Sequence, residues 1–337
     1  MRSSYLFTPL IPPRNNVTSL VRCLDSSALP RLHGAPLGSG IFRHQPEDFK
    51  VDELMDDSFS LQGEHLWVKI SKRDQNTSWV AGLLAELAEI PRHSVGYCGL
   101  KDRFAVTTQW YSLHLPGREL ALDALEHKDF KILLARRHHK KARRGMHRGN
   151  RFEILLRDCH IDSEALAMRL DTICRQGVPN YFAEQRFGNR GENLKRAQEL
   201  IDQNQLKGNR KGTGIILSAA RSWLFNQVLA DCIENHKDIL INSPTAEGPL
   251  WGRGRSGAVD EMAEIEARVL GEWKDWCYAL EHAGLTQQRR SLLINPEDFT
   301  SQWILPGTLQ LKFCLPVGSY ATALLREIAE LSRPHKP

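Results

Sequence analysis

The stretch Ser94-Val-Gly-Tyr-Cys-Gly-Leu-Lys-Asp-Arg103 joins a mostly apolar run to a turn that starts at Gly99. This pattern predicts a short strand from 94 to 98 that ends where the turn begins. The turn carries a single carboxylate, Asp102. A carboxylate in a turn is most often a solvated residue without chemistry of its own, so its role depends on what surrounds it.

A catalytic role would require Asp102 to stay ionised inside a cleft, and a buried carboxylate needs a cation beside it. Lys101 and Arg103 are its neighbours in the sequence. Adjacent side chains of an extended segment point to opposite faces, however, so neither is well placed to pair with it. A cation from another strand is the better partner, and Arg43 and Lys50 are the two candidates.

Residues 136 to 151 (RRHHKKARRGMHRGNR) form a second unusual stretch, with eight lysines and arginines, three histidines and no acid. The whole chain has a formal net charge of +5, so the remainder sums to −3 and the positive charge is local. Charge runs are usually solvated faces or disordered loops, but this one lies between two expected strands. It predicts phosphate binding to a nucleic acid by these side chains: Arg136, Arg137, Lys140, Lys141, Arg143, Arg144 and Arg148.

The pattern of apolar residues predicts a mixture of strands and helices. The expected strands are 47–54, 65–71, 94–98, 109–115, 131–135, 150–157 and 309–315. One helix is expected to start near Asn76. The other expected helices cover 163–176, 192–204, 216–236, 259–280 and 321–331. Regular βαβ alternation is missing from this order, so the fold class is α+β with a largely antiparallel sheet. Helices dominate from Gly177 onward, which indicates a sheet domain interrupted by a mostly helical insertion.

The composition excludes several other classes of protein. A chain of 337 residues with 41% hydrophobic and 25% charged residues is typical of a globular protein with two domains. No apolar run approaches the ~20 residues that span a bilayer, so we expect no membrane partner. The seven cysteines are widely spaced without a C-x-x-C pair, and His138 and His139 lie in the basic run. We therefore expect neither a disulfide framework nor a metal site.

Two shorter motifs have an ordinary explanation as well as a functional one. Gly252-Arg-Gly-Arg-Ser-Gly257 matches the glycine pattern of dinucleotide-binding loops, but no convincing parallel strand precedes it, which favours a basic surface loop. Asn150 and Phe152 share one face of an expected strand, as an amide and a ring that bind a flipped base would. Alone, these two residues are better explained as a turn asparagine beside a buried phenylalanine.

In combination, the motifs of this chain resemble those of the tRNA pseudouridine synthase D (TruD) family over about residues 32 to 332. The resemblance is carried by the following segments, in order: Gln45-Pro-Glu-Asp-Phe49, Gly99-Leu-Lys-Asp-Arg103, Ala105-Val-Thr, Gln109-Trp110, Gly149-Asn-Arg-Phe152, Val178-Pro-Asn-Tyr-Phe182, Gln185-Arg-Phe-Gly188, Ser218-Ala-Ala-Arg221, Leu224-Phe-Asn-Gln227 and Leu315-Pro-Val-Gly-Ser-Tyr-Ala-Thr322.

The resemblance implies a pseudouridine synthase catalytic domain, 32–177 and 297–337, and a family-specific insertion, 178–296. Residues 1–31 would be a weakly structured leader. The implied reaction is the isomerisation of uridine to pseudouridine at position 13 of tRNA, without a cofactor. Asp102 matches the catalytic aspartate. The positions that match substrate-binding residues are Phe49, Asn150, Phe152 and Tyr320, with Arg43 as the cation that pairs with the aspartate. Tyr320 stands where the family pattern has phenylalanine.

The expected enzyme is thus a cytoplasmic isomerase that acts on tRNA as a monomer. Two other classes stay open from the residues alone. A non-catalytic RNA-binding or RNA-folding factor would explain the basic run but not the ordered motifs. A glycosidase acting on nucleosides would normally need a second carboxylate. Within the leading class, the RNA target could also be a different one.

Overall fold

The structure is a computed structural model that describes residues 28–56, 58–207 and 212–334. Most of the expected leader, 1–31, lies outside the described residues. The chain divides into two compact units. The sheet unit comprises Pro36–Arg175, Asn295–Ala321 and Ile328–Pro337, and the helical unit comprises Met1–Ala35, Gln176–Ile294 and Thr322–Glu327.

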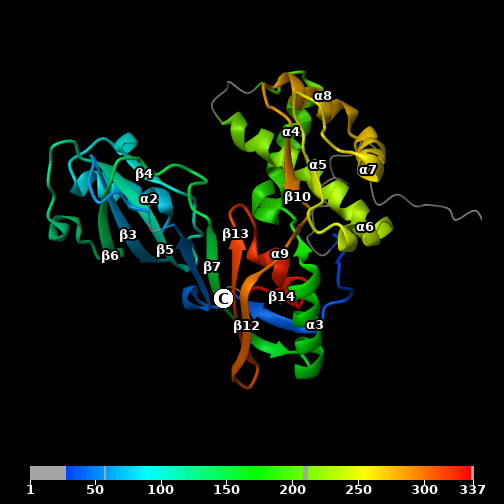
Figure 1. The fold of residues 1–337 in the computed structure, drawn as a ribbon, viewed down its shortest axis with the longest axis horizontal. Helices are drawn as coiled ribbons and strands as arrows, with labels where there is room; N and C mark the ends of the chain where they lie inside the picture. Colours follow the sequence, from blue (N-terminus) through cyan, green and yellow to red (C-terminus); the bar gives the residue numbers. More distant parts are fainter. Residues whose placement is uncertain (1–27, 57, 208–211, 335–337) are drawn as a thin grey trace, which may run out of the picture. The chain divides into compact units, whose positions relative to one another are not determined.

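The sheet unit is built on a ten-stranded sheet whose main path runs β12-β13-β7-β2-β5-β3-β6 (Figure 1). The strands are β1 (Ser39–Phe42), β2 (Phe49–Leu54), β3 (His65–Arg73), β4 (Val95–Tyr97), β5 (Val106–His114), β6 (Phe130–His138), β7 (Gly149–His160), β12 (Glu297–Leu305), β13 (Thr308–Pro316) and β14 (Glu330–Ser332). Among the described residues, β2–β5 and β1–β14 pair in parallel and the other neighbours are antiparallel. The α+β class with a mixed, mainly antiparallel sheet is confirmed.

Alternation along β3 explains how one end of this sheet is covered on both faces. Leu66, Val68 and Ile70 point to one face, where α2 (Thr77–Leu87) packs against them with its own buried side chains (Figure 1). Trp67 points to the other face, against Trp110 of β5. The buried indole of Trp67 donates to the carbonyl of Lys140 at 2.7 Å, so the polar end of this side chain is satisfied as well.

The helical unit surrounds one long apolar helix, α5 (Thr213–Asn235). This helix is hydrophobic on most of its circumference and is accordingly buried, with Trp223, Leu224 and Phe225 at most 2% exposed. The unit also contains the helices α4 (Glu192–Asp202), α6 (Lys237–Asn242), α7 (Asp260–Gly271) and α8 (Lys274–His282), most of the short helix α9 (Ala321–Leu325), and the strands β8 (Val178–Pro179), β9 (Glu247–Leu250), β10 (Gln288–Ser291) and β11 (Leu293–Ile294). The mostly helical character expected after Gly177 is present.

Two expected helices differ from those observed, and several strands and helices have shifted bounds. The helix expected over 259–280 is two helices, α7 and α8, because the chain leaves helical geometry at Trp273. The helix expected over 321–331 stops early, as α9 (Ala321–Leu325), because Glu330–Ser332 pairs with β1 instead. β6 extends to His138, so the basic segment starts inside a strand. Helix α3 (Ser163–Gln176) has the bounds that its spacing predicted. Within the described residues, no helix is long and apolar enough to cross a bilayer.

Candidate active site

The loop that carries Asp102 is fixed to the sheet and to α2 by its main chain. The amide of Gln109, on β5, donates to the carbonyl of Gly99 at 3.0 Å. The backbone N–H of Lys101 donates to the hydroxyl of Thr77, at the start of α2, at 3.0 Å. The hydroxyl of Thr77 donates in turn to the side-chain oxygen of Gln109 at 2.8 Å. This closed network of buried hydrogen bonds holds the turn in one place.

Asp102 pairs with Arg43, which follows β1 in the chain. The Nη2 atom of Arg43 lies 2.6 Å from Oδ2 of Asp102, and the two side chains are 15% and 31% exposed. Burial lowers the pKa of the Arg43 guanidinium, while the charge of Asp102 opposes that shift. The structure therefore selects Arg43 from the two candidate cations. The other candidate, Lys50, pairs with Glu153 at 2.8 Å.

Aromatic rings form the floor under Arg43. Its guanidinium lies 4.1 Å from the ring centre of Phe49 and 5.0 Å from that of Phe42. A cation over aromatic faces is held in orientation as well as in place. Arg43 has a φ of 58°, a left-handed conformation that is uncommon for residues other than glycine. The ion pair and the two ring contacts offset this local strain.

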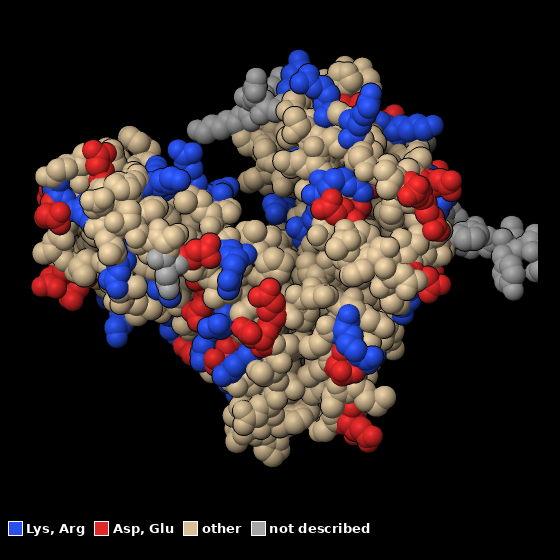
Figure 2. Space-filling model, viewed as in Figure 1, with Lys and Arg blue, Asp and Glu red and all other residues tan. Residues whose placement is uncertain are grey.

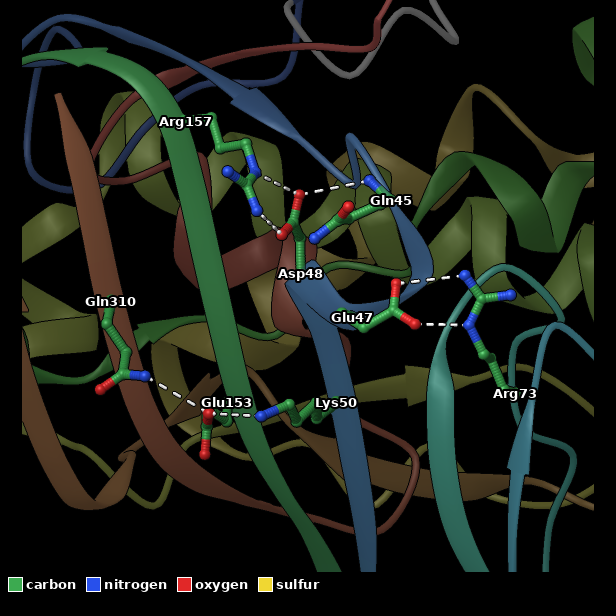
Figure 3. Close-up of polar contacts among 8 residues, drawn as sticks. All are labelled: Gln45, Glu47, Asp48, Lys50, Arg73, Glu153, Arg157 and Gln310. Atoms are coloured by element: carbon green, nitrogen blue, oxygen red, sulfur yellow. Dashed lines mark hydrogen bonds and ion pairs between the residues drawn. The ribbon is translucent and has the colours of Figure 1, made fainter. Parts of the chain in front are cut away.

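The Gln45-Pro-Glu-Asp-Phe49 motif makes the turn that places Phe49 (Figure 3). Asp48 is fully buried and accepts two hydrogen bonds from Arg157 of β7, at 2.8 and 2.7 Å, and one from the backbone N–H of Gln45, at 3.2 Å. A bidentate arginine–carboxylate pair fixes both partners in direction. The turn is thereby attached to β7, and the first residue of β2, Phe49, enters the buried face.

Strand β7 places the next two expected site residues on the same face of the sheet. Phe152 is 5% exposed and lies 6.0 Å from the ring centre of Phe49 and 5.4 Å from that of Phe313. Asn150 is half-buried between its Cα partners Glu53 and Leu315, and its Oδ1 atom is buried without a hydrogen-bond partner among the described residues. A buried unpaired acceptor costs free energy unless a ligand satisfies it.

The sequence therefore anticipated most of a contiguous cluster. Arg43, Asp102, Phe49 and Phe152 are linked by successive contacts. Tyr320 lies after β13 in the same unit, immediately before α9, and is half-buried. Sequence reasoning did not single out Thr77 as part of this site. The only available signal was its place at a helix start, which is common to many surface threonines.

The side chains of the basic segment, 136–151, fall into two groups: some bond to carbonyl groups of the protein, and others are exposed. Arg137 is turned inward, donating to the carbonyl of Arg118 at 2.6 Å and pairing with Glu119 at 3.0 Å. Lys141 donates to the carbonyl of His93. Of the seven side chains expected to bind phosphate, those that are exposed are Arg136, Lys140, Arg143, Arg144 and Arg148. Figure 2 shows lysine and arginine side chains gathered on the rim of the sheet unit next to β4.

The end of the basic segment packs against the loop of Asp102. His147 is 6% exposed, and a side chain on Gly99 would come within 3.2 Å of its ring, which explains the glycine at that position. The N–H of Gly145 donates to the carbonyl of Cys98 at 2.8 Å. Burial and the charge of Lys101 lower the pKa of His147. The loop and the segment expected to bind phosphates are thus in direct contact.

Comparison with known proteins identifies the family. The family model of tRNA pseudouridine synthase D (TruD) matches residues 33–209. The tRNA pseudouridine synthase D of Cellvibrio japonicus is 42% identical over 312 residues, covering 90% of this chain and 93% of that protein. That of Aeromonas hydrophila is 40% identical over 334 residues, covering 90% of this chain and 94% of its own. The chain belongs to the tRNA pseudouridine synthase D family.

Among solved structures, one from Methanosarcina mazei assigned to TruD shares the fold, with a TM-score of 0.62 over 88% of this chain and 95% of that one. At 21% sequence identity, this likeness concerns the fold alone. Among the described residues of this TruD family member, no group of three or more histidine, cysteine, aspartate or glutamate side chains could hold a metal ion.

Lys72, on β3, is a buried cation within electrostatic reach of Asp102. Its ammonium donates to the carbonyl of Gln75 at 2.6 Å. Burial lowers the pKa of Lys72 to about 8, and the charge of Asp102 only partly offsets this shift. A lysine in the unfolded chain titrates near ~10.4. Between these two values the folded chain binds fewer protons than the unfolded chain, so stability rises with pH.

We predict that Lys72→Met removes this pH dependence. Below about pH 8 the buried lysine is charged, and the folded protein bears the full cost of that charge. The difference in free energy of unfolding between the unsubstituted chain and Lys72→Met should therefore change by about 2 kcal/mol in favour of the unsubstituted chain from pH 7.5 to 10. Urea unfolding of both proteins across this range measures the difference in their free energies of unfolding. The titrations of all other groups are common to both proteins and cancel in that difference. Parallel curves would contradict the prediction, because they would show that Lys72 stays protonated in the folded protein across this range, as it does in the unfolded chain.

Proposed function

We propose that this chain converts uridine 13 of tRNA to pseudouridine, with Asp102 as the nucleophile or base. The observation that carries the proposal is the 2.6 Å contact between Asp102, which is still 31% exposed, and Arg43, whose guanidinium lies over the buried ring of Phe49. The relatives in Cellvibrio japonicus and Aeromonas hydrophila are tRNA pseudouridine synthases, which supports tRNA as the substrate.

The reaction breaks the bond from N1 to C1′, turns the base and joins C5 to C1′. C5 loses a proton and N1 gains one, so the product is an isomer of the substrate. Because neither redox change nor group donor is required, we propose that the reaction needs no cofactor. Asp102 would begin it by attack at C1′ or by removing a proton from C2′. The Arg43 guanidinium balances the charge of the carboxylate in its half-buried position.

The neighbouring residues have matching roles in the proposal. The uridine must leave the base stack, at a cost of a few kcal/mol. Its base would lie against the aromatic cluster of Phe49 and Phe152, with Asn150 Oδ1 free to accept a hydrogen bond from the base edge. The half-buried Tyr320 would complete the substrate contacts. We further propose that the protein acts as a monomer in the cytoplasm.

Purified protein incubated with an unmodified tRNA transcript in buffer with EDTA tests the proposal. Pseudouridine should appear at position 13 without added cofactor. Binding without pseudouridine would favour an RNA-folding factor, and release of free uracil would favour a glycosidase. Pseudouridine at another position would keep the reaction and change the target.

The exposed end of the basic segment gives a separate prediction about binding. Replacing Arg143, Arg144 and Arg148 by alanine should weaken tRNA binding and reduce the slope of log K against log salt by about 2 to 3, because each lost phosphate contact contributes about 0.7 to 0.9. The matched control replaces Arg73, Arg175 and Arg196, which are exposed but pair with carboxylates. Equal slopes in both triple variants would mean that residues 143–148 do not contact RNA.

A further inference from the structure

A buried ion pair adjoins Asp102 and has no part in the proposed chemistry. The ammonium of Lys101 lies 2.9 Å from Oε2 of Glu53, and the two side chains are 5% and 0% exposed. The other oxygen of Glu53 accepts the backbone N–H of Trp110, on β5, at 3.0 Å. Both oxygens of the carboxylate are therefore occupied, and the pair joins β2, β5 and the residue immediately before Asp102.

Stability alone does not account for such a pair. Removing two charges from water costs several kcal/mol per ion, and well-packed apolar side chains of similar volume are often as stable or more so. The ion pair does supply direction, because a carboxylate that is already held at one oxygen by the Trp110 N–H fixes the ammonium that binds its other oxygen. The neighbouring titratable groups include His147 from the basic segment, Cys98 just after β4, Lys72 of β3 and Tyr111 of β5.

The pair completes the attachment of the loop on one side of Asp102. The main chain is bound at Cys98, Gly99 and Lys101 by hydrogen bonds of 2.8 to 3.0 Å. The side chain of Lys101 adds a bond from this segment to β2, the strand that starts with Phe49. On the other side of Asp102 the backbone N–H of Asp74 donates to the carbonyl of Ala105 at 3.0 Å, but the ion pair between Arg103 and Asp74 is exposed, with its atoms 3.4 Å apart.

We propose that Glu53 and Lys101 are positioning residues, which hold the Asp102 loop in register with β2 so that the carboxylate meets Arg43 over the aromatic floor. Neither residue touches the substrate. The inference rests on the proposed function for its catalytic readout, but its structural consequence can be measured without catalysis. Displacing a reacting group by about 1 Å costs up to about 100-fold in rate, so even a small movement of this loop is measurable.

The decisive variants are Glu53→Gln, Lys101→Met and the double variant that carries both. Each single variant leaves one buried charge or polar group without its partner, and so loses stability as well as position. The double variant contains no buried charge, and both substitutions nearly conserve volume. It should therefore regain stability without regaining the bond that locates the loop.

Lys50 and Glu153 provide a matched control. They form an ion pair of 2.8 Å, and Lys50 lies on the same strand as Glu53, but the side chains are 46% and 30% exposed (Figure 3). The variants Lys50→Met and Glu153→Gln, alone and together, should behave like the unsubstituted protein. Any effect that also appears in these variants comes from charge removal on β2 and not from the position of the loop.

Single-turnover formation of pseudouridine, tRNA affinity and urea unfolding are measured for all variants. We expect the double variant Glu53→Gln, Lys101→Met to unfold at a urea concentration close to that of the unsubstituted protein, to bind tRNA within about threefold and to react about 30- to 100-fold more slowly. A double variant that recovers both stability and rate would overturn the proposal, because the pair would then be structural only.

Hydrogen exchange supplies the readout that does not depend on activity. Peptides covering 98–105 should exchange at least about tenfold faster in Lys101→Met and in the double variant, and at unchanged rates in the Lys50 and Glu153 variants. Unchanged exchange in Lys101→Met would also overturn the inference. If exchange accelerates while the unsubstituted protein makes no pseudouridine in any tRNA, the proposed function fails and the positioning of the loop stands.

Discussion

Replacing Asp102 by asparagine is expected to lower the rate of pseudouridine formation by at least about 10⁴-fold, since the removal of a catalytic nucleophile or base costs this much or more in other enzymes. Asparagine has nearly the same size and can still accept a hydrogen bond from Arg43. The fold and the phosphate contacts should therefore be retained, and tRNA affinity should stay within a few-fold. Single-turnover assays and direct binding measure the two quantities separately.

The control for this variant is Asp52→Asn. Asp52 is an exposed carboxylate on β2, the strand that holds Glu53, and it lies on the solvent face. Its removal changes the net charge of the chain by the same amount but should change the rate by less than about twofold. If Asp102→Asn still turned over tRNA at a comparable rate, another group would have to start the reaction.

Replacing Arg43 by methionine has the second largest expected effect. The variant keeps an unbranched side chain over Phe49 but leaves Asp102 without its cation. Loss of a preorganised charge partner in an active site costs about 10²- to 10³-fold in rate, and we expect a loss in this range. Arg43→Lys keeps the charge but loses the planar contact with the ring, so its rate should lie between that of the unsubstituted protein and that of Arg43→Met.

The two Arg43 variants separate charge from shape. Equal losses in Arg43→Met and Arg43→Lys would indicate that the planar guanidinium, stacked 4.1 Å above Phe49, matters more than the charge. No loss in either variant would remove Arg43 from the active site, despite its contact with Asp102. Urea unfolding controls for the left-handed backbone at this position, because lysine and methionine share the strain of arginine there.

The sequence predicted the fold most reliably where the pattern of a segment agrees with its surroundings. The alternation of Leu66, Val68 and Ile70 identified β3 because one face of that strand packs against α2. The end of the chain shows the opposite case. Residues Glu330–Ser332 form a strand because β1, almost 300 residues earlier, offers a parallel edge, and local spacing contains no information about such a partner.

The candidate site was predictable in its residue types but not in its connections. The need of Asp102 for a distant cation followed from the geometry of an extended segment, yet the choice between Arg43 and Lys50 required the fold. The importance of Glu53 could not be anticipated, because a glutamate within an alternating strand is usually solvated. Burial of this residue depends on Lys101 reaching it from another element.

In the basic segment, composition does not show which side chains are available to bind phosphate. Seven of its side chains were expected to bind phosphates, but Arg137 and Lys141 donate to carbonyl groups of the protein instead. Sequence alone cannot distinguish a basic side chain that faces solvent from one that satisfies a neighbouring loop. For this reason the salt-dependence prediction uses only residues that the structure leaves exposed.

The central claim is that Asp102 starts the conversion of uridine 13 of tRNA to pseudouridine. It is tested most directly by mapping pseudouridine at single-nucleotide resolution in the RNA of cells that lack the protein and are supplied with either the unsubstituted chain or Asp102→Asn. The account predicts that one signal, at position 13 of tRNA, returns with the unsubstituted chain and not with the variant. A signal that returns with both proteins, or with neither, would contradict it.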